Sequence, residues 1–433
     1  MSAFSTHLAL HNNLQRTHRP LPEFLNTRIN AYFEEYDPKK WGGGHIMRGR
    51  TPGVDDVRLT SNDYLSIAQH PEILQAMAKS ILNDGNGLLM SGVFLHGNNP
   101  QMNLERKLAE YMHAEAGVLC QSGWCANTGL IQSIANKNIP VYIDMLAHTS
   151  LWEGIQSASA NAVPFMHNDP EHLRKQVKHH GAGVIIVDSI YSTMGSICPL
   201  TEIVDISEEN GCILVVDESH SLGTHGPHGE GLVVALGLTE YVHFRTASLA
   251  KAFAGRAGFI TCPKRFSEYF RYESNPAIFS STLLPHDVAG LDATLTVIQR
   301  EDWRRKRLHA NAAWLRASLE ELGYNLNSSE SQIVSLEAGP EQSTMKLRDA
   351  LESHGIFGSV FMAPATPKNR SLIRFSVNAL LTENELERIV EVCRDIREEV
   401  DMQNWPSTRR LRRASRPAPA VPPASQPELA LAA

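Results

Sequence analysis

The sequence CILVVDESHSLGTHGPHGEG, residues 212–231, joins an apolar run to a polar loop rich in glycine and histidine. The run from Ile213 to Val216 predicts a buried β-strand, and it ends on Asp217, Glu218, Ser219 and His220. Carboxylates are rarely buried without a partner. Asp217 is therefore either a residue at a strand end that turns into solvent, or a carboxylate held on a buried strand by a cation.

The chain around this stretch alternates short apolar runs with longer segments of helical period, which is typical of a parallel sheet with crossover helices. From about Leu291 the pattern changes to long helical stretches and a smaller α+β unit. The expected strands are Ala116–Cys120, Val141–Asp144, Gly183–Asp188, Ile213–Asp217, His243–Ala247, Gly258–Cys262 and, in the smaller unit, Ser371–Val377. The expected helices are Met102–Met112, Asn127–Ile134, Pro170–His179, Leu200–Glu209, Asp302–Leu322 and one from Glu383 to about Val400. The sequence thus predicts an α/β protein with a mostly parallel sheet.

Four segments are expected along the chain: an N-terminal segment at 1–60, a large domain at 61–290, a small C-terminal α+β domain at 291–400 and a tail at 401–433. The tail contains the basic cluster RRLRRASR and then PAPAVPPASQPELALAA, which lacks apolar residues to bury. We expect it to be disordered. The basic cluster could contact RNA or anionic lipid, or it could simply be solvated.

The composition of the 433 residues is that of an ordinary globular protein, with 42% hydrophobic and 20% charged residues. No apolar run approaches the roughly 20 residues of a membrane helix, so no membrane insertion is expected. A net charge of −7 does not indicate nucleic-acid binding. The first residues, MSAFSTHLALHNNLQRTHRP, contain no apolar core of a secretory signal. The six cysteines show no CxxC pairing, which predicts reduced thiols in a cytoplasmic protein and no metal site.

Polar groups follow five of the expected strands, at the edge where open parallel sheets bind ligands. One of them, Lys251, lies among small apolar residues in TASLAKAFAGRAG. Such surroundings disfavour a charged amine and suit one that forms a Schiff base, although a lysine snorkelling from a helix start would look the same. The five groups are Gln121-Ser122-Gly123-Trp124, Ala147-His148-Thr149-Ser150, Asp188 with Ser192, Asp217 with His220, and Ser248 with Lys251.

Lysine for an aldehyde and aspartate for a pyridine nitrogen is the pairing that pyridoxal phosphate requires. Asp217 would then be kept on its buried strand by a buried cation. In QSGWCANTGLIQSIAN, the residues Ser122, Gly123 and Trp124 stand at the start of a helix, which favours an anion such as the phosphate. Ser248 can add a hydroxyl. His148 could stack on the cofactor ring as a neutral group, or it could be a structural histidine.

The pattern DESH…G…G followed by TASLAK resembles the α-oxoamine synthases, a branch of the fold-type-I pyridoxal-phosphate enzymes. The resemblance runs from TSNDYLSIAQHPEI (60–73) to LIRFSVNALLT (372–382). Within it, QSGWCAN, YIDMLAHTSLWEG, PFMHND, VDSIYSTMGSICPL, DESHSLGTHGP, TASLAKAFAGRAG and PAIFSSTLLP are similar to the α-hydroxyketone autoinducer synthases of bacterial quorum sensing, the CqsA type. The resemblance implies a homodimer with active sites at the subunit interface.

Residue roles follow from the resemblance, position by position. Catalytic roles fall to Lys251 as the Schiff-base amine, Asp217 at the pyridine nitrogen, His220 at the side of the ring's phenolic oxygen and His148 on the ring face. Ser192 would assist from the other edge, and Gly123, Trp124 and Ser248 would hold the phosphate, joined by Ser281 and Thr282 reaching across from the partner subunit. Arg374 would bind the substrate carboxylate, and Asn62 would lie near the entrance for the amino acid.

One loop departs from the family pattern. In DGNGLLMSGVFLHGNNP, Leu88, Leu89, Met90 and Phe94 stand where relatives carry a glycine- and arginine-rich stretch. Such a loop fits a long acyl chain, but it could equally pack against the partner subunit.

The resemblance implies that the enzyme joins a medium- or long-chain acyl-CoA to a small amino acid, 2-aminobutyrate or S-adenosylmethionine. Loss of CoA and CO2 would give an α-aminoketone precursor of an α-hydroxyketone autoinducer. The alternatives are a generic α-oxoamine synthase, similar to 8-amino-7-oxononanoate synthase or serine palmitoyltransferase, and an aminotransferase on the same fold. A cofactor-binding regulator fits less well, because every expected catalytic role is filled and no DNA-binding segment is present.

Overall fold

The computed structural model describes residues 20–35, 39, 41–42, 44–326 and 328–408. The chain forms two compact units, one up to Gly49 and one from Arg50 onward, and each is described by itself. The first unit contains helix α2 (Glu23–Glu34). The second unit contains the three sheets discussed below and every residue of the candidate site.

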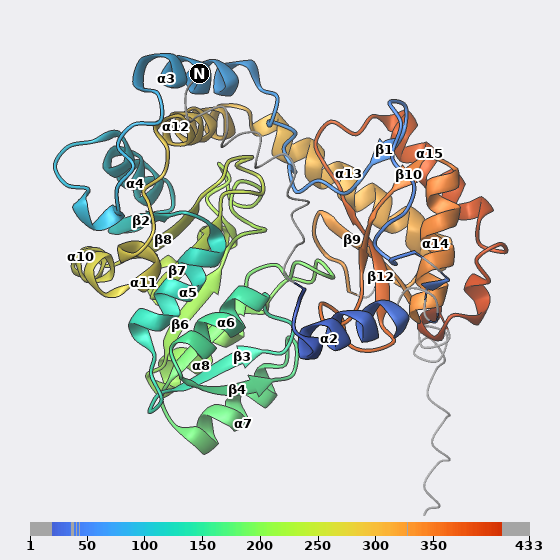
Figure 1. Cartoon of the computed structure of the whole chain (residues 1–433), viewed down its shortest axis with the longest axis horizontal. Helices are drawn as coiled ribbons and strands as arrows, with labels where there is room; N and C mark the ends of the chain where they lie inside the picture. Colours follow the sequence, from blue (N-terminus) through green and yellow to red (C-terminus); the bar gives the residue numbers. More distant parts are fainter. Residues whose placement is uncertain (1–19, 36–38, 40, 43, 327, 409–433) are drawn as a thin grey trace, which may run out of the picture. The chain divides into compact units, whose positions relative to one another are not determined.

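A seven-stranded sheet organises the larger part of the second unit (Figure 1). Its strands follow the order β2-β8-β7-β6-β5-β3-β4. Only β8 runs antiparallel to its neighbours, so the prediction of a mostly parallel sheet is confirmed. The strands are β2 (Ala116–Cys120), β3 (Pro140–Asp144), β4 (Asn161–Phe165), β5 (Val184–Asp188), β6 (Ile213–Asp217), β7 (Phe244–Ser248) and β8 (Gly258–Cys262).

Edge strand β4 is the one strand of this sheet that the sequence analysis did not predict. Its sequence, NAVPF, contains a proline. Proline is tolerated on an edge strand because the outer edge of such a strand forms no hydrogen bonds to a neighbouring strand. Three of its five residues are exposed, so the strand lacks the continuous apolar run that marks its buried neighbours.

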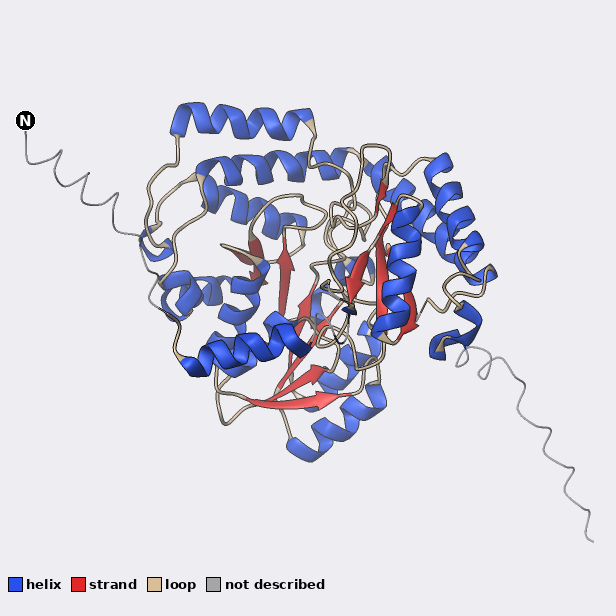
Figure 2. Cartoon of the chain, turned by 45° about the vertical axis from the view of Figure 1, so that its right-hand side comes forward, coloured by secondary structure: helices blue, strands red, loops and turns tan. Residues whose placement is uncertain are grey.

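Helices surround the strands of the sheet (Figure 2). Alternate residues of the strands belong to two separate hydrophobic clusters on its opposite faces. Ile185 and Leu214 face one side with α7 (Pro170–His180) and α8 (Leu200–Asn210), whereas Ile186 and Val215 face the other with α5 (Gly123–Ile134) and α6 (Thr149–Ser157). The same cluster as α5 includes Phe270 of α10 (Lys264–Glu273). The remaining helical segments here are α3 (Pro71–Asp84), η2 (Gly92–Phe94), α4 (Pro100–Tyr111), α9 (Leu232–Ala235), η3 (Thr239–Tyr241), α11 (Asn275–Ile278) and α12 (Pro285–Arg300).

The smaller part of the second unit is built on an antiparallel sheet in the order β11-β12-β9. A separate parallel pair of β1 and β10 ties residues 57–58 to it. Its strands are β1 (Val57–Arg58), β9 (Ile333–Gly339), β10 (Ile356–Phe357), β11 (Ser359–Phe361) and β12 (Ser371–Ser376); its helices are α13 (Asp302–Glu321), α14 (Glu341–Ser353), α15 (Glu383–Asp395) and η4 (Met402–Asn404).

Three expected boundaries differ from the structure. Helix α12 runs through the expected domain boundary at 290/291, and α15 ends at Asp395 instead of near Val400. Residues 401–408 are ordered although they were expected to belong to a disordered tail. Trp405 is buried and donates its indole N–H to the Val400 carbonyl at 2.9 Å, so an apolar anchor extends the folded region. The basic cluster of the tail lies outside the described residues.

Within the described residues, no helix combines the length and the apolar character that a membrane span requires.

Candidate active site

A cavity opens at the carboxyl ends of the parallel strands, where the strand-end residues converge as predicted. Asp217 ends β6, Ser248 ends β7 and Lys251 lies just beyond β7. The residues that line the cavity are Gly123, Trp124, Asn127, His148, Ser150, Asp188, Ile190, Asp217, Ser219, His220, Ser248 and Lys251. Nine residues of the five strand-end groups named from the sequence are thus brought together: Gly123, Trp124, His148, Ser150, Asp188, Asp217, His220, Ser248 and Lys251.

Asp217 is buried, and both of its carboxylate oxygens accept hydrogen bonds. The Asn127 side chain donates to Oδ2 and the backbone N–H of Ser219 donates to Oδ1, each at 2.8 Å. The carboxylate forms no ion pair with any side chain that the structure describes. A buried carboxylate with two neutral donors and no cation is suited to pair with a protonated ring nitrogen, as pyridoxal phosphate would provide.

Lys251 lies in the tight connection between the antiparallel strands β7 and β8. The buried side chains of Leu249, Ala252 and Phe253 flank it. Gly223 has a φ of +85°, and a Cβ there would come within 2.7 Å of the Ala252 Cβ, so the loop after Asp217 packs tightly on the lysine loop. Burial and the charge of Arg374 lower the pKa of Lys251, against the opposing effect of Asp217. The amine is therefore biased toward its neutral, nucleophilic form.

The N-terminus of α5 and the end of β7 form a close-packed cradle. A Cβ at Gly123 would come within 2.5 Å of the Ser248 Cβ, so only glycine allows this approach. The Oγ of Ser122 accepts from the Cys125 N–H at 3.1 Å as the helix N-cap, and Ser122 does not line the cavity. The Oγ of Ser219 accepts from the Ser248 N–H at 2.7 Å. Backbone N–H groups and hydroxyls at a helix N-terminus fit a phosphate.

His148 caps α6 and joins a chain of hydrogen bonds that ends on Asp217. Its Nδ1 lies 2.7 Å from the Ser150 Oγ, and the same hydroxyl accepts from the Asn127 amide at 2.8 Å. The Ser150 backbone N–H also donates to Nδ1, so Nδ1 is an acceptor and Nε2 carries the proton. Burial lowers the pKa of His148, Asp217 raises it and Lys251 lowers it. The ring is thus neutral, as stacking on a cofactor requires.

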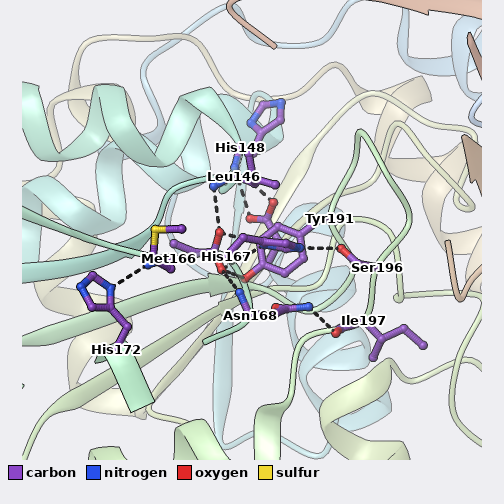
Figure 3. A network of polar contacts seen from close by, with 11 residues as sticks. Leu146, His148, Met166, His167, Asn168, His172, Tyr191, Ser196 and Ile197 are labelled. Carbon is purple, nitrogen blue, oxygen red and sulfur yellow. Dashed lines mark hydrogen bonds and ion pairs between the residues drawn. The ribbon is translucent and has the colours of Figure 1, made fainter. Parts of the chain in front are cut away.

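A buried network beneath His148 fixes the loop that carries it (Figure 3). Asp144, at the end of β3, accepts from the backbone N–H groups of Leu146 and Asn168 at 2.8 and 2.9 Å and from the Tyr191 hydroxyl at 2.9 Å. His167 lies between this carboxylate and the Ser196 hydroxyl, at 3.0 and 2.9 Å. Ser196 is buried, so the Asp–His–Ser arrangement serves as packing and offers no accessible nucleophile.

Asp188, at the end of β5, connects this network to the cavity. The backbone N–H of His148 donates to its Oδ2 at 3.1 Å. Burial, with the nearby carboxylates of Asp217 and Asp144, raises the pKa of Asp188 well above its usual range. The Asp188 carboxyl therefore favours its protonated form and lines the cavity as a neutral hydrogen-bonding group.

Arg374 is presented by β12, in the middle of the antiparallel sheet. Its neighbours Ile373 and Phe375 point into the hydrophobic core, so Arg374 faces the opposite side. Its guanidinium donates to the Ser192 carbonyl at 2.6 Å and to Asn62 Oδ1 at 2.9 Å, and it lies over the Phe361 ring. The side chain is buried, its Nε has no hydrogen-bond partner, and no described carboxylate pairs with it. The structure thus joins Asn62, Ser192 and Arg374, three residues proposed from the sequence.

His220 is connected to Asn62 and Arg374 through the hydroxyl of Tyr64. The Tyr64 hydroxyl lies 2.7 Å from His220 Nδ1 and 3.3 Å from Asn62 Oδ1. Burial, followed by the charges of Lys251, Arg374 and His148, lowers the pKa of His220 well below its usual range. His220 is therefore neutral at the wall of the cavity.

Ser281 and Thr282 lie outside this cavity in the single chain. Ser281 is exposed and pairs with Ser91 of the apolar loop, and its carbonyl accepts from the Gln121 side chain at 2.7 Å. The Thr282 N–H donates to the Met90 carbonyl at 2.9 Å. Leu88, Leu89 and Phe94 are exposed. The loop and the two hydroxyls thus form one surface next to the start of α5.

The sequence analysis missed Asn127, Tyr64 and Ser219 as site residues, and it named Ser150 only as a member of a strand-end group. The sequence offered one indication for Asn127, because asparagine is a poor helix former and yet stands here in the second turn of α5. Tyr64 stands beside Asn62 in SNDYL, but nothing in the sequence separates it from a core tyrosine. No group of three or more His, Cys, Asp or Glu side chains suited to a metal ion occurs in the described part of the chain.

Several known proteins are similar to this chain in sequence. Residues 54–392 match the family described as "Aminotransferase class I and II". The CAI-1 autoinducer synthase of Vibrio campbellii is 46% identical over 87% of this chain and 96% of its own. The chain belongs to the α-oxoamine synthases.

Two further relatives agree with this membership. A putative 8-amino-7-oxononanoate synthase of Halalkalibacterium halodurans is 33% identical over 77% of this chain and 85% of its own. A solved structure of SPT with PLP superposes with a TM-score of 0.78 at 25% identity and covers 88% of this chain and 98% of the solved one. The family resemblance and the fold-type-I architecture predicted from the sequence are confirmed.

Proposed function

We propose that this α-oxoamine synthase uses pyridoxal 5'-phosphate to condense a medium- or long-chain acyl-CoA with a small amino acid. The C–S bond of the thioester breaks, a C–C bond forms between the acyl carbon and the amino acid's α-carbon, and the carboxyl group leaves as CO2. The CoA thiolate takes up one proton. The product is an α-aminoketone, which later steps would convert to an α-hydroxyketone autoinducer. The 46% identity to a CAI-1 autoinducer synthase supports this reaction.

The cavity fits the proposed cofactor at each of its polar groups. Asp217 would pair with the ring nitrogen, Lys251 would bind the aldehyde carbon and the cradle of Gly123 and Ser248 would hold the phosphate. His148 would cover the ring face and His220 would contact the phenolic oxygen. When bound, pyridoxal phosphate supplies an electron sink that stabilises negative charge at the amino acid's α-carbon.

The observation that carries the proposal is the buried guanidinium of Arg374, which forms no ion pair with a carboxylate of the described residues. A buried arginine with a free Nε and no carboxylate partner is costly unless a ligand neutralises it. It would bind the substrate carboxylate, preferably in the bidentate geometry that arginine favours. Lys251 Nζ, whose pKa burial lowers, is suited to accept the α-proton once it is free.

The thioester's acyl chain would lie on the exposed apolar loop of Leu88, Leu89 and Phe94. This loop pairs with Ser281, which in turn accepts from Gln121 next to the phosphate cradle. An apolar path would therefore begin at the cavity. Each buried methylene contributes about 0.8 kcal/mol, or roughly fourfold in affinity.

The remaining parts of the proposal concern the assembly and its surroundings. Ser281 and Thr282 would reach the phosphate of the partner subunit in a homodimer with shared sites. The amino acid would be 2-aminobutyrate or S-adenosylmethionine, and the enzyme would act in the cytoplasm without nucleic-acid partners or membrane insertion.

The test is to incubate the purified, cofactor-loaded protein with a ladder of acyl-CoA lengths and a panel of amino acids while CoA release is recorded. We expect release only when an amino acid is present, with rates that rise with chain length and remain low for acetyl- and succinyl-CoA. Arg374→Lys should raise the KM of the amino acid at least tenfold and leave that of the thioester within about twofold. A preference for pimeloyl- or succinyl-CoA would support a generic synthase, and transfer of the amino group to a keto acid without CoA release would support an aminotransferase.

A further inference from the structure

Tyr64 connects the side of the site that carries His220 with the side that carries Arg374. It is fully buried on the segment between β1 and α3. Among the described residues, its hydroxyl lies within hydrogen-bond distance only of His220 Nδ1, at 2.7 Å, and Asn62 Oδ1, at 3.3 Å. Asn62 Oδ1 in turn accepts from Arg374. None of the roles proposed above for the site residues explains why a tyrosine stands at this position.

The direction of the Tyr64–His220 hydrogen bond follows from acidity. A phenol is a stronger acid than a neutral imidazole N–H, and an imidazole nitrogen is a better acceptor than a phenol oxygen. The bond to Nδ1 is also much shorter than the contact with Asn62, whose oxygen is already served by Arg374. The phenol O–H therefore donates to Nδ1.

This direction determines where the single proton of His220 resides. The ring is buried and neutral, so an accepting Nδ1 leaves the proton on Nε2. His220 lines the cavity, and its Nε2 has no hydrogen-bond partner among the described residues. Nε2–H is thus the donor that remains for a ligand.

We propose that Tyr64 is a positioning residue that holds the proton of His220 on Nε2, so that this nitrogen donates a hydrogen bond to an anionic ligand oxygen in the cavity. The inference rests on the proposed function only for the identity of that oxygen, the phenolic oxygen of the cofactor ring. Without the Tyr64 hydroxyl, the proton distributes between the two ring nitrogens, and part of the population presents a lone pair to the oxygen.

The tautomer is measurable in the cofactor-free protein, independently of any activity. Two-dimensional 15N NMR of histidine-labelled protein separates protonated from unprotonated ring nitrogens, and the signal lost in His220→Gln assigns the residue. We expect a protonated Nε2 and an unprotonated Nδ1 in the wild type, and a mixture in Tyr64→Phe. A protonated Nδ1 of His220 in the wild type would overturn the proposal.

Kinetics provide the second readout. Tyr64→Phe should lower kcat about tenfold while the KM of the amino acid changes less than threefold, because Arg374 keeps its contact with Asn62. The visible absorbance of the loaded enzyme should also change its pH dependence. The matched control is Tyr324→Phe, whose equally buried hydroxyl donates to the Cys393 carbonyl at 2.7 Å in the core of the smaller part of the fold.

The outcomes separate the possible failures. A Tyr64→Phe variant with unchanged kcat and a raised KM would show that the hydroxyl acts through Asn62 and Arg374, which would contradict the proposal. Equal losses of kcat in Tyr64→Phe and Tyr324→Phe would reduce its role to packing. If no thioester reacted with the wild type, the proposed function would fail, whereas the tautomer measurement would still decide the role of Tyr64.

Discussion

The side-chain amide of Asn127 donates a 2.8 Å hydrogen bond to Oδ2 of Asp217, a residue 90 positions further along the chain. Asn127 lies on α5, whose N-terminus forms the proposed phosphate cradle, and Asp217 ends β6. One bond thus connects the two ends of the proposed cofactor site. The same amide also serves the Ser150 hydroxyl, which contacts His148.

Asn127→Ala should lower kcat at least about tenfold, because hydrogen bonds to charged groups contribute roughly 1.5–3 kcal/mol. The KM values should change much less, since Asn127 touches neither proposed substrate. Steady-state kinetics of the loaded enzyme provide the measurement. Asn210→Ala is the matched control, because its amide donates to the Ile206 carbonyl on α8, away from the cavity. A turnover within twofold of wild type would contradict this role of Asn127.

The pKa of Lys251 should move in opposite directions when its two charged neighbours are changed. Asp217 raises this pKa and Arg374 lowers it, so Asp217→Asn should lower it further and Arg374→Met should raise it. The measurement is pulse labelling of the cofactor-free protein with an acylating reagent across pH, followed by peptide mass spectrometry, with exposed Lys346 as the internal reference. An unchanged pKa of Lys251 in both variants would show that burial alone controls the amine and would contradict this prediction.

Substitution of the apolar loop should change the choice of thioester and leave the amino acid unaffected. The double variant Leu88→Ser/Leu89→Ser should reduce the ratio of kcat/KM for long over short acyl-CoA at least tenfold, because about two apolar contacts are lost. The KM of the amino acid should stay within twofold. Leu236→Ser, at another exposed leucine, should leave the ratio unchanged. An unchanged ratio in the double variant would mean that the loop does not contact the acyl chain.

Mixed dimers test the sharing of sites between subunits. A Lys251→Ala chain and a Ser281→Ala/Thr282→Ala chain should each be nearly inactive alone, whereas their purified heterodimer should regain up to half of the wild-type activity through one intact site. Ser280→Ala should remain active, since its hydroxyl is bound to the Pro276 carbonyl. Absence of activity in verified heterodimers would place both hydroxyls and Lys251 in the same subunit's site.

The sequence predicted the central strands β5 and β6 well because their apolar runs are continuous and each ends on an aspartate. It missed β4 because a half-exposed edge strand containing Pro164 has no such run. In the site, Asp217, Lys251 and His148 could be predicted because each lies at the end of a strand or shortly after it. Tyr64 and Asn127 could not, since their roles depend on contacts with His220 and Asp217, 156 and 90 residues away, which only the folded chain brings together.

The reaction itself is tested most directly with an amino acid labelled with 13C at its carboxyl carbon. When the loaded enzyme receives this substrate and a long-chain acyl-CoA, the account predicts equal amounts of labelled CO2 and free CoA. The product should contain the acyl group joined to the amino acid's α-carbon and carry no label. Release of a labelled keto acid without free CoA, or a product that retains the labelled carboxyl group, would contradict the account.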